Sequence, residues 1–118
     1  MEDEAMRTVT LGVSSIEETR RQMAAAFQGE RQGEFITFAS VELLWKVLTA
    51  KRWEILQVMT GQGGMSIREV TRRVGRDVKA VHGDVIALIH AGVLDRSGEG
   101  VVFPYDAVHV DFTVRKAA

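Results

Sequence analysis

The sequence of 118 residues has no cysteine, a single proline and no long apolar run. Without cysteine there is no disulfide, no thiol nucleophile and no zinc or iron–sulfur site that needs thiolate ligands. A membrane-spanning helix needs about 18 consecutive apolar residues, which this sequence does not offer. The acidic start, from Met1 to Glu4, is unlike a secretory signal. We therefore expect a cytoplasmic protein that has no membrane partner.

The composition is that of an ordinary globular domain, with 46% hydrophobic and 26% charged residues. A chain of this length can form one domain with a real core. Its net charge of −1 hides an uneven distribution, because residues 46–96 carry nine basic and five acidic side chains, whereas residues 1–45 carry four basic and eight acidic ones. A basic middle between acidic ends can bring one face to a polyanion, although ordinary solvated surface would also explain the surplus.

Three segments outside the middle are predicted to be strands, either from apolar–polar alternation or from β-branched and aromatic residues. They cover residues 7–13, 34–38 and 107–114. Between the first two, Ser15 and Glu18 form a capping box that predicts a helix to about Phe27. We expect an N-terminal strand–helix–strand segment (residues 1–39) to pack with a C-terminal strand segment (residues 105–118) as one small sheet.

A sheet of this size would leave part of its apolar face exposed in a monomer. We therefore expect the layer to join two chains into a homodimer. The alternative is that the layer only thickens a monomer.

The middle of the chain predicts four helices, each introduced by a residue that can cap a helix N-terminus. The helices begin after Ser40, Thr49, Ser66 and Asp77 and cover about residues 41–48, 50–59, 67–74 and 78–90. Glycines at residues 61, 63, 64, 75 and 92 are placed to end three of them. A turn at residues 97–100 predicts a hairpin, which Pro104 ends because proline cannot donate to a strand ladder.

The spacing of apolar residues predicts the buried face of each helix. In the first helix we expect burial of Val41, Leu44, Trp45 and Leu48. In the last helix we expect a buried stripe of Val78, Val81, Val85 and Leu88. Trp53 is expected in the core as well.

The order of helix, short helix, glycine turn, longer helix and hairpin is typical of a winged helix-turn-helix, here over residues 40–104. In that fold the short helix braces the longer one, which enters the DNA major groove, and the hairpin reaches flanking phosphates. The longer helix must then present small or polar residues opposite its buried stripe, because a bulky apolar surface cannot satisfy base edges. The expected fold class is α+β, a winged helix-turn-helix with additional N-terminal and C-terminal strands.

The candidate DNA-binding residues surround the turn between the two helices. The candidate base contacts are Lys79, Ala80, His82 and Gly83, which are cationic, polar or small. The candidate phosphate contacts are Arg72, Arg73, Arg76 and Arg96. Ser66, Arg68 and Asp77 complete the set at the helix starts, where free N–H groups attract anions. The alternative for the arginines and the lysine is an ordinary solvated face.

These residues also carry a family resemblance. The stretches from Ser66 to Val70, from Val74 to His82 and from Ala91 to Arg96 resemble the MarR-like winged-helix regulators of bacteria and archaea. The likeness covers about residues 41–114 and is similar to a small group that continues, as here, into Val102 to Asp106 and an alternating strand. The resemblance implies a homodimeric DNA-binding transcriptional regulator, and some relatives resemble antitoxin partners of a toxin. An acidic hairpin tip, Glu99, departs from the usual Arg or Lys and argues against minor-groove contacts there.

Two classes of function follow from these observations. The first is a sequence-specific binder of double-stranded DNA, acting as a dimeric repressor, with no enzymatic activity, cofactor or metal. The second is a protein-interaction module, an antitoxin that masks a toxin enzyme, in which the acidic residues 1–45 would cover a basic partner. His109 and Asp111 share a strand face, but two ligands do not make a metal site. The glycines at residues 61–64 lack the Lys-Ser/Thr of a phosphate loop.

Overall fold

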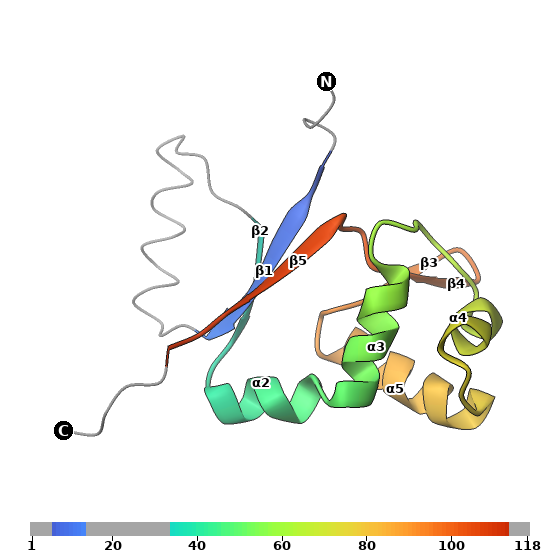
Figure 1. Ribbon diagram of the computed structural model, residues 1–118, viewed down its shortest axis with the longest axis horizontal. Helices are drawn as coiled ribbons and strands as arrows, with labels where there is room; N and C mark the ends of the chain where they lie inside the picture. Colours follow the sequence, from blue (N-terminus) through green and yellow to red (C-terminus); the bar gives the residue numbers. More distant parts are fainter. Residues whose placement is uncertain (1–5, 14–33, 114–118) are drawn as a thin grey trace.

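The computed structural model describes residues 6–13 and 34–113, which form an α+β fold (Figure 1). The elements follow in the order β1 (Thr8–Val13), β2 (Glu34–Phe38), α2 (Val41–Val47), α3 (Ala50–Met59), α4 (Ile67–Val74), α5 (Val78–His90), β3 (Asp95–Ser97), β4 (Gly100–Val102) and β5 (Ala107–Asp111). The α+β class predicted from the sequence is confirmed. The predicted helix between Ser15 and Phe27 lies outside the described residues. No helix of the described part has the length and apolarity of a membrane span.

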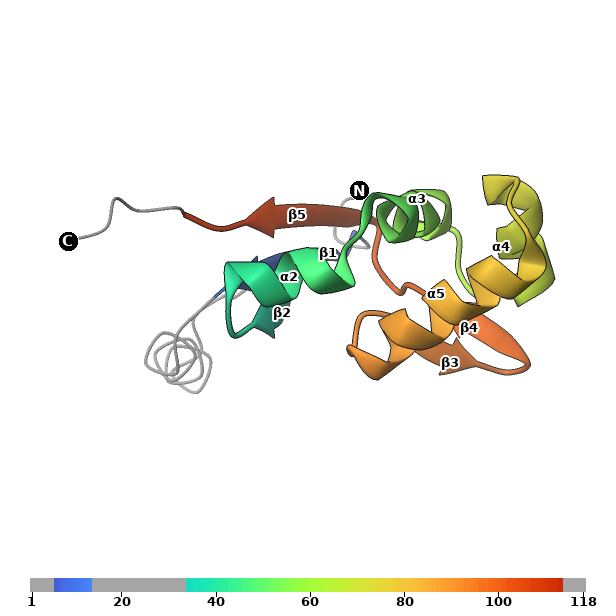
Figure 2. The same cartoon turned by 90° about the horizontal axis from the view of Figure 1, so that it is seen from below.

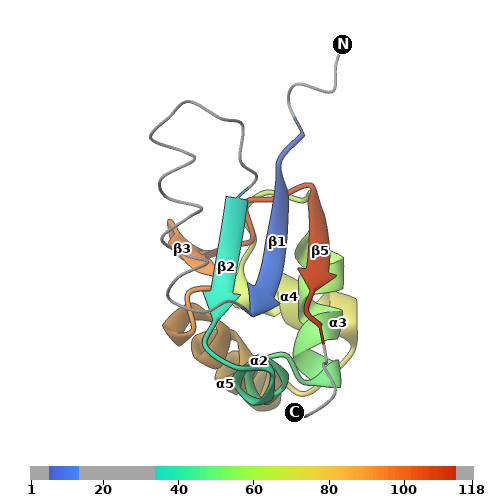
Figure 3. The ribbon, with the colours of Figure 1, turned by 90° about the vertical axis from the view of Figure 1, so that its left-hand side faces the viewer.

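The two ends of the described chain meet in one three-stranded sheet. Its strand order is β2-β1-β5, and both pairings are parallel (Figure 3). The register pairs Thr8 with Ala107 and Gly12 with Asp111, so the last strand lies beside the first. Val9 and Leu11 are buried on one face, where α2 packs against β1 and β2. The alternation predicted for residues 7–13 is therefore confirmed, and β5 alternates half-buried Val108 and Val110 with exposed His109 and Asp111.

Arg7 joins the starting ends of the three strands. Its Nη2 atom lies 2.6 Å from Glu34 Oε1, and its guanidinium lies 5.0 Å from the centre of the Tyr105 ring. The backbone N–H of Arg7 donates to Asp106 Oδ2 at 2.9 Å. These contacts connect the chain before β1 with the start of β2 and with the segment that enters β5, and so they help to set the parallel register.

The four described helices begin as the sequence predicts. Ser40 Oγ accepts from the N–H of Leu43, and Thr49 Oγ1 accepts from the N–H of Arg52. A single core extends from Leu11 of β1 through Leu44 of α2 to the helical part of the chain. Its buried helical members include Ile55, Leu56, Met59, Val70, Val81, Val85 and Leu88.

Two predictions of burial are wrong. Trp45 is 53% exposed and Val78 is 51% exposed. In α2 the sheet covers only one side, which Leu44 occupies, and the next residue points about 100° away. Val78 is the first residue of α5, and full burial begins only at Val81, one turn later. Val41 and Trp53 are half-buried, and Trp53 packs against the core.

The hairpin of β3 and β4 is anchored to the segment that precedes α4. The two strands pair antiparallel, with Arg96 opposite Val101. Met65 adds a bridge to the same hairpin, because its N–H donates to the Val101 carbonyl at 2.9 Å and its carbonyl accepts from the Val101 N–H at 2.9 Å. This close approach leaves no room for a side chain at Gly100, where a Cβ would overlap the carbonyl group of Met65.

We predict that Gly100→Ala lowers the free energy of unfolding by about 1–3 kcal/mol or more, because the backbone of Met65 cannot rotate away and would have to move. Urea denaturation measures the change. Gly83→Ala is the matched control, because a Cβ at this helical glycine meets nothing within 4 Å. The control is expected to raise the free energy of unfolding by roughly 0.5–1 kcal/mol. An unchanged stability of Gly100→Ala would contradict the contact with Met65.

Candidate nucleic-acid interface

Helices α4 and α5 are joined by a tight turn at Gly75. Gly75 has φ +69°, a left-handed conformation that favours glycine, and its N–H donates to the Thr71 carbonyl at 2.9 Å. Asp77 then caps α5, since its Oδ2 accepts from the N–H groups of Lys79 and Ala80. The two helices pack against each other and against α3 (Figure 2). Local chemistry therefore sets where each helix begins and ends.

The N-terminal half of α5 presents a continuous exposed surface. Lys79, Ala80, His82 and Gly83 are all exposed, as the sequence predicts. Val78, which the apolar spacing predicts to be buried, extends this surface. The only side chain in this half of the helix that is fully buried is Val81. The exposed side of the helix thus combines one cation and one imidazole with Val78, Ala80 and Gly83.

Glu69 holds two of the predicted phosphate contacts along the outer side of α4. Its Oε2 accepts from Arg72 Nη2 and from Arg73 Nε, both at 2.6 Å. These hydrogen bonds lower the pKa of Glu69 to about 2, so the carboxylate remains charged at neutral pH. Arg72 is still 72% exposed, whereas Arg73 is less exposed and also donates to Gln62 Oε1 at 3.1 Å. Any anion that binds these arginines has to compete with Glu69.

Ser66 and Glu69 have the spacing of a capping box, but only one half of it is formed. Ser66 Oγ does accept from the N–H of Glu69 at 3.0 Å. The Glu69 carboxylate, however, goes to the two arginines instead of back to the Ser66 N–H, because guanidinium groups are the stronger partners. Ser66 and Asp77 therefore serve as helix caps in this structure.

Arg76 lies inside the fold, where it contacts Asp84 of α5. Its Nη2 donates to Asp84 Oδ2 at 2.8 Å, and its side chain is only 17% exposed. Arg76 Nη1 is buried and has no hydrogen-bond partner among the described residues. The structure thus brings Arg76 to the back of α5 and not to the exposed surface that carries Lys79 and His82.

Asp84 also binds Arg52 of α3, which completes a cluster of three charged side chains. Arg52 Nε donates to Asp84 Oδ1 at 3.0 Å, and Arg52 Nη1 donates to the carbonyl of Val47 at 3.2 Å. Burial raises the pKa of the Asp84 carboxyl, but the hydrogen bonds from Arg76 and Arg52 outweigh burial, so its pKa lies below the ordinary value. The cluster ties α5 to α3, to the end of α2 and to the α4–α5 turn.

Asp84 and Arg52 are not among the site residues that the sequence predicts. A signal for Asp84 was present, since an acid stands between Val81 and Val85 on the side of the helix that faces the core. Its partners could not be found in this way, because Arg52 lies 32 residues earlier and no local spacing connects the two.

The remaining predicted residues lie as follows. Arg68 is exposed in the first turn of α4, next to the cap. Arg96 is exposed on β3, in the hairpin. The surface that we call the α5 surface consists of Arg68, Arg72, Val78, Lys79, Ala80, His82 and Gly83. Its members are exposed residues of α4 and of the N-terminal half of α5.

The fold and this surface define an α+β protein in which two capped helices expose cations and small residues around one turn. The family model HVO_A0114 matches residues 47–110, which is more than half of the chain, so the chain belongs to the HVO_A0114 family. The matched span contains α3, α4, α5 and the hairpin, and it ends within β5. The comparison with curated proteins and the comparison with solved structures found no match.

We predict that Asp84→Asn lowers the free energy of unfolding by roughly 1.5–3 kcal/mol at pH 7, because two partly buried arginines lose their charged partner. The pKa of the Asp84 carboxyl is lowered in the folded protein. Its contribution to the free energy of unfolding is therefore complete at pH values above its ordinary pKa of 3.8, and it is lost as the pH falls through the lowered pKa. The difference between the wild type and the variant should therefore shrink in acid.

Urea denaturation at several pH values between 7 and 2 measures this difference. Glu99→Gln, at the exposed tip of the hairpin, is the control and should show little effect at any pH. A wild type and Asp84→Asn that differ equally at every pH would show that the charge of Asp84 is not the cause.

Proposed function

We propose that this chain is a sequence-specific binder of double-stranded DNA that regulates transcription, as a MarR-like winged helix-turn-helix protein. In this proposal α4 braces the fold, α5 is the recognition helix, and β3 and β4 form the wing. The observation that supports it most directly is the exposure of Lys79, His82 and small residues in the N-terminal half of α5, together with the exposure of Arg68 and Arg72 on α4. A recognition helix uses this half to contact base edges.

The side chains on α5 suit the major groove. Lys79 can donate to guanine O6 or N7, and His82 can donate to or accept from a base edge. Val78 adds an apolar group that can contact a thymine methyl. Gly83 has open space around it, so the helix backbone can approach the DNA closely there. The helix has 13 residues, about 20 Å in length, which is long enough to lie across a groove about 12 Å wide.

Phosphate contacts in this proposal come from Arg68 and Arg72 on α4 and from Arg96 on the wing. Arg73 is a weaker candidate because it already binds Glu69 and Gln62. Arg76 is left out because it is paired with Asp84 inside the fold. DNA binding would exchange the Glu69 carboxylate for a phosphate oxygen at Arg72, so this contact would contribute less than a free arginine does.

The regulator acts as a homodimeric repressor in this proposal. Operators of helix-turn-helix proteins are commonly two-fold symmetric, and a dimer matches that symmetry. This proposal assigns no enzymatic step to the α5 surface.

The experiment that tests this function is selection from a pool of random DNA duplexes, followed by fluorescence anisotropy on the enriched sequence at several salt concentrations. We predict that His82→Ala costs about 1–3 kcal/mol on the selected duplex and relaxes the preference at one base pair. Arg72→Ala should weaken all duplexes alike and reduce the salt slope by less than the roughly one unit of a free cation, because Arg72 already binds Glu69. If no sequence is enriched and no duplex binds at low salt, the antitoxin-like interaction module becomes the better hypothesis.

Gly83→Ala provides a test in which folding and binding change in opposite directions. The added methyl should stabilise the free protein by roughly 0.5–1 kcal/mol, because alanine favours the helix and meets no neighbour. It should also weaken binding to the selected duplex by about 1–3 kcal/mol, because the helix can no longer approach the bases as closely. Thermal denaturation and anisotropy measure the two effects. Equal affinity of the variant and the wild type would place Gly83 outside the interface.

A further inference from the structure

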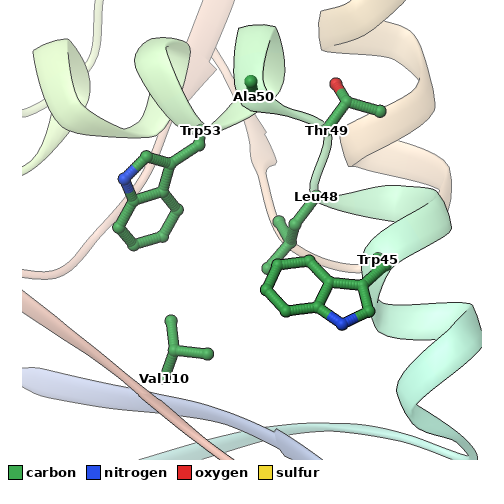
Figure 4. A pocket seen from close by; sticks show the side chains of 6 residues that line it. All are labelled: Trp45, Leu48, Thr49, Ala50, Trp53 and Val110. Atoms are coloured by element: carbon green, nitrogen blue, oxygen red, sulfur yellow. The ribbon is translucent and has the colours of Figure 1, made fainter.

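An apolar groove lies between the α2–α3 junction and β5, on the opposite part of the molecule from the α5 surface (Figures 1 and 4). Its volume is about 510 Å³, and its described lining consists of Trp45, Leu48, Thr49, Ala50, Trp53 and Val110. Trp45 stands at one end, where it also makes an edge-to-face contact with Phe112 at 5.4 Å between ring centres. The described lining is almost wholly apolar and includes two indoles.

One wall of this groove belongs to a strand whose other side is free within the described residues. The sheet order is β2-β1-β5, so β5 is an outer strand, and no described strand pairs with its second edge (Figure 3). Outer strands are commonly protected by lysine, proline or a bulge. The sequence of β5, Ala-Val-His-Val-Asp, contains none of these. Its free N–H and C=O groups can therefore accept another strand.

The side chains of β5 are complementary to a second copy of β5 in one register. Val110 has its side chain in the groove, whereas the side chains of its two neighbours, His109 and Asp111, are exposed on the opposite face of the sheet. In an antiparallel pair that is centred on Val110, each His109 lies directly opposite the partner's Asp111. On the groove side, each Val108 then lies opposite the partner's Phe112, and the two Val110 residues meet at the two-fold axis.

The neighbouring registers that keep the apolar faces together are worse. Centring the pair on Asp111 places two carboxylates directly opposite each other, which destabilises a strand pair. Centring it on His109 places two imidazoles opposite each other and leaves Asp111 opposite the partner's Ala107. Only the register about Val110 gives two acid–imidazole pairs on one face and an apolar row on the other.

We infer that two copies of this chain associate through β5, antiparallel and centred on Val110, and that their sheets join into one sheet of six described strands. The apolar row from Val108 to Phe112 of each copy then borders the groove of the other. This inference rests on the homodimer of the proposed function and names its interface. The two-fold axis of the strand pair is the axis that would relate the two α5 surfaces.

A cysteine scan tests the pairing directly, because the chain has no cysteine of its own. In Val110→Cys the two thiols lie on the axis, and directly opposite residues have Cα atoms about 4.5–5.5 Å apart, which a disulfide can bridge. Val108→Cys is the matched control on the same face, since its two copies lie about 13 Å apart along the strands. Mild oxidation followed by a non-reducing gel should give a covalent dimer for Val110→Cys alone. Equal cross-linking of both variants, or of neither, would overturn the inference.

A charge exchange tests the register without new covalent bonds. Asp111→Lys places a cation opposite His109 and should raise the dimer dissociation constant roughly 2- to 30-fold, because two cross-strand pairs are lost. The double variant His109→Asp with Asp111→Lys restores opposite charges and should restore the dimer. Glu99→Lys, on the exposed hairpin tip, is the control and should leave the dimer unchanged. Sedimentation equilibrium without DNA measures all four proteins.

The outcomes separate this interface from DNA binding. A wild type that is monomeric at every concentration overturns the inference. A dimer whose dissociation constant is the same in the wild type and in Asp111→Lys overturns it as well. If Val110→Cys cross-links as expected but the protein binds no duplex, the result supports the interface and contradicts only the DNA-binding function.

Discussion

The placement of α5 depends on a carboxylate that points away from the exposed side of the helix. Asp84 accepts from Arg52 of α3 and from Arg76 of the α4–α5 turn, and all three side chains are mostly shielded from water. Apolar packing of Val81, Val85 and Leu88 holds the helix against the core, but burial of apolar area is non-directional and does not by itself fix the orientation of the helix. Two directional ion pairs on opposite oxygens of one carboxylate restrict that movement, because hydrogen bonds to charged groups weaken quickly with poor geometry. The direction in which Lys79 and His82 point is therefore coupled to α3 and to the turn.

Ion pairs and hydrogen bonds within the fold also limit the number of cations that remain available for a polyanion. The middle of the chain has a surplus of positive charge, yet Arg52, Arg73 and Arg76 are engaged with acidic or polar side chains of the fold. A count of charges along the sequence therefore overstates the positive surface. Under the proposed function, DNA affinity would depend on a few exposed cations and on the exchange of Glu69 for phosphate at Arg72. Such a surface favours specificity from base contacts over affinity from charge.

The sheet and the helical part are held together by one core, although the chain between β2 and β5 forms all of the described helices. Arg7 and Asp106 bring the first and last strands together, and the parallel register follows from that junction. The strand order β2-β1-β5 leaves β5 at the outside, next to the groove of Trp45 and Trp53. The topology thus places an open strand edge and an apolar groove side by side, which is the basis of the inferred dimer.

The sequence by itself determined the local structure of this protein. Ser40, Thr49, Ser66 and Asp77 cap their helices as predicted, Gly75 ends α4, and the alternation of β1 and β5 identifies their buried faces. These features depend on residues that are close in the chain. Only the tertiary structure decided that Trp45 and Val78 are exposed and that Arg76 turns inward to Asp84. Periodicity shows which side of a helix is apolar. Whether a neighbouring element covers that side, and which distant charged residue binds the helix, depends on where the neighbouring elements lie.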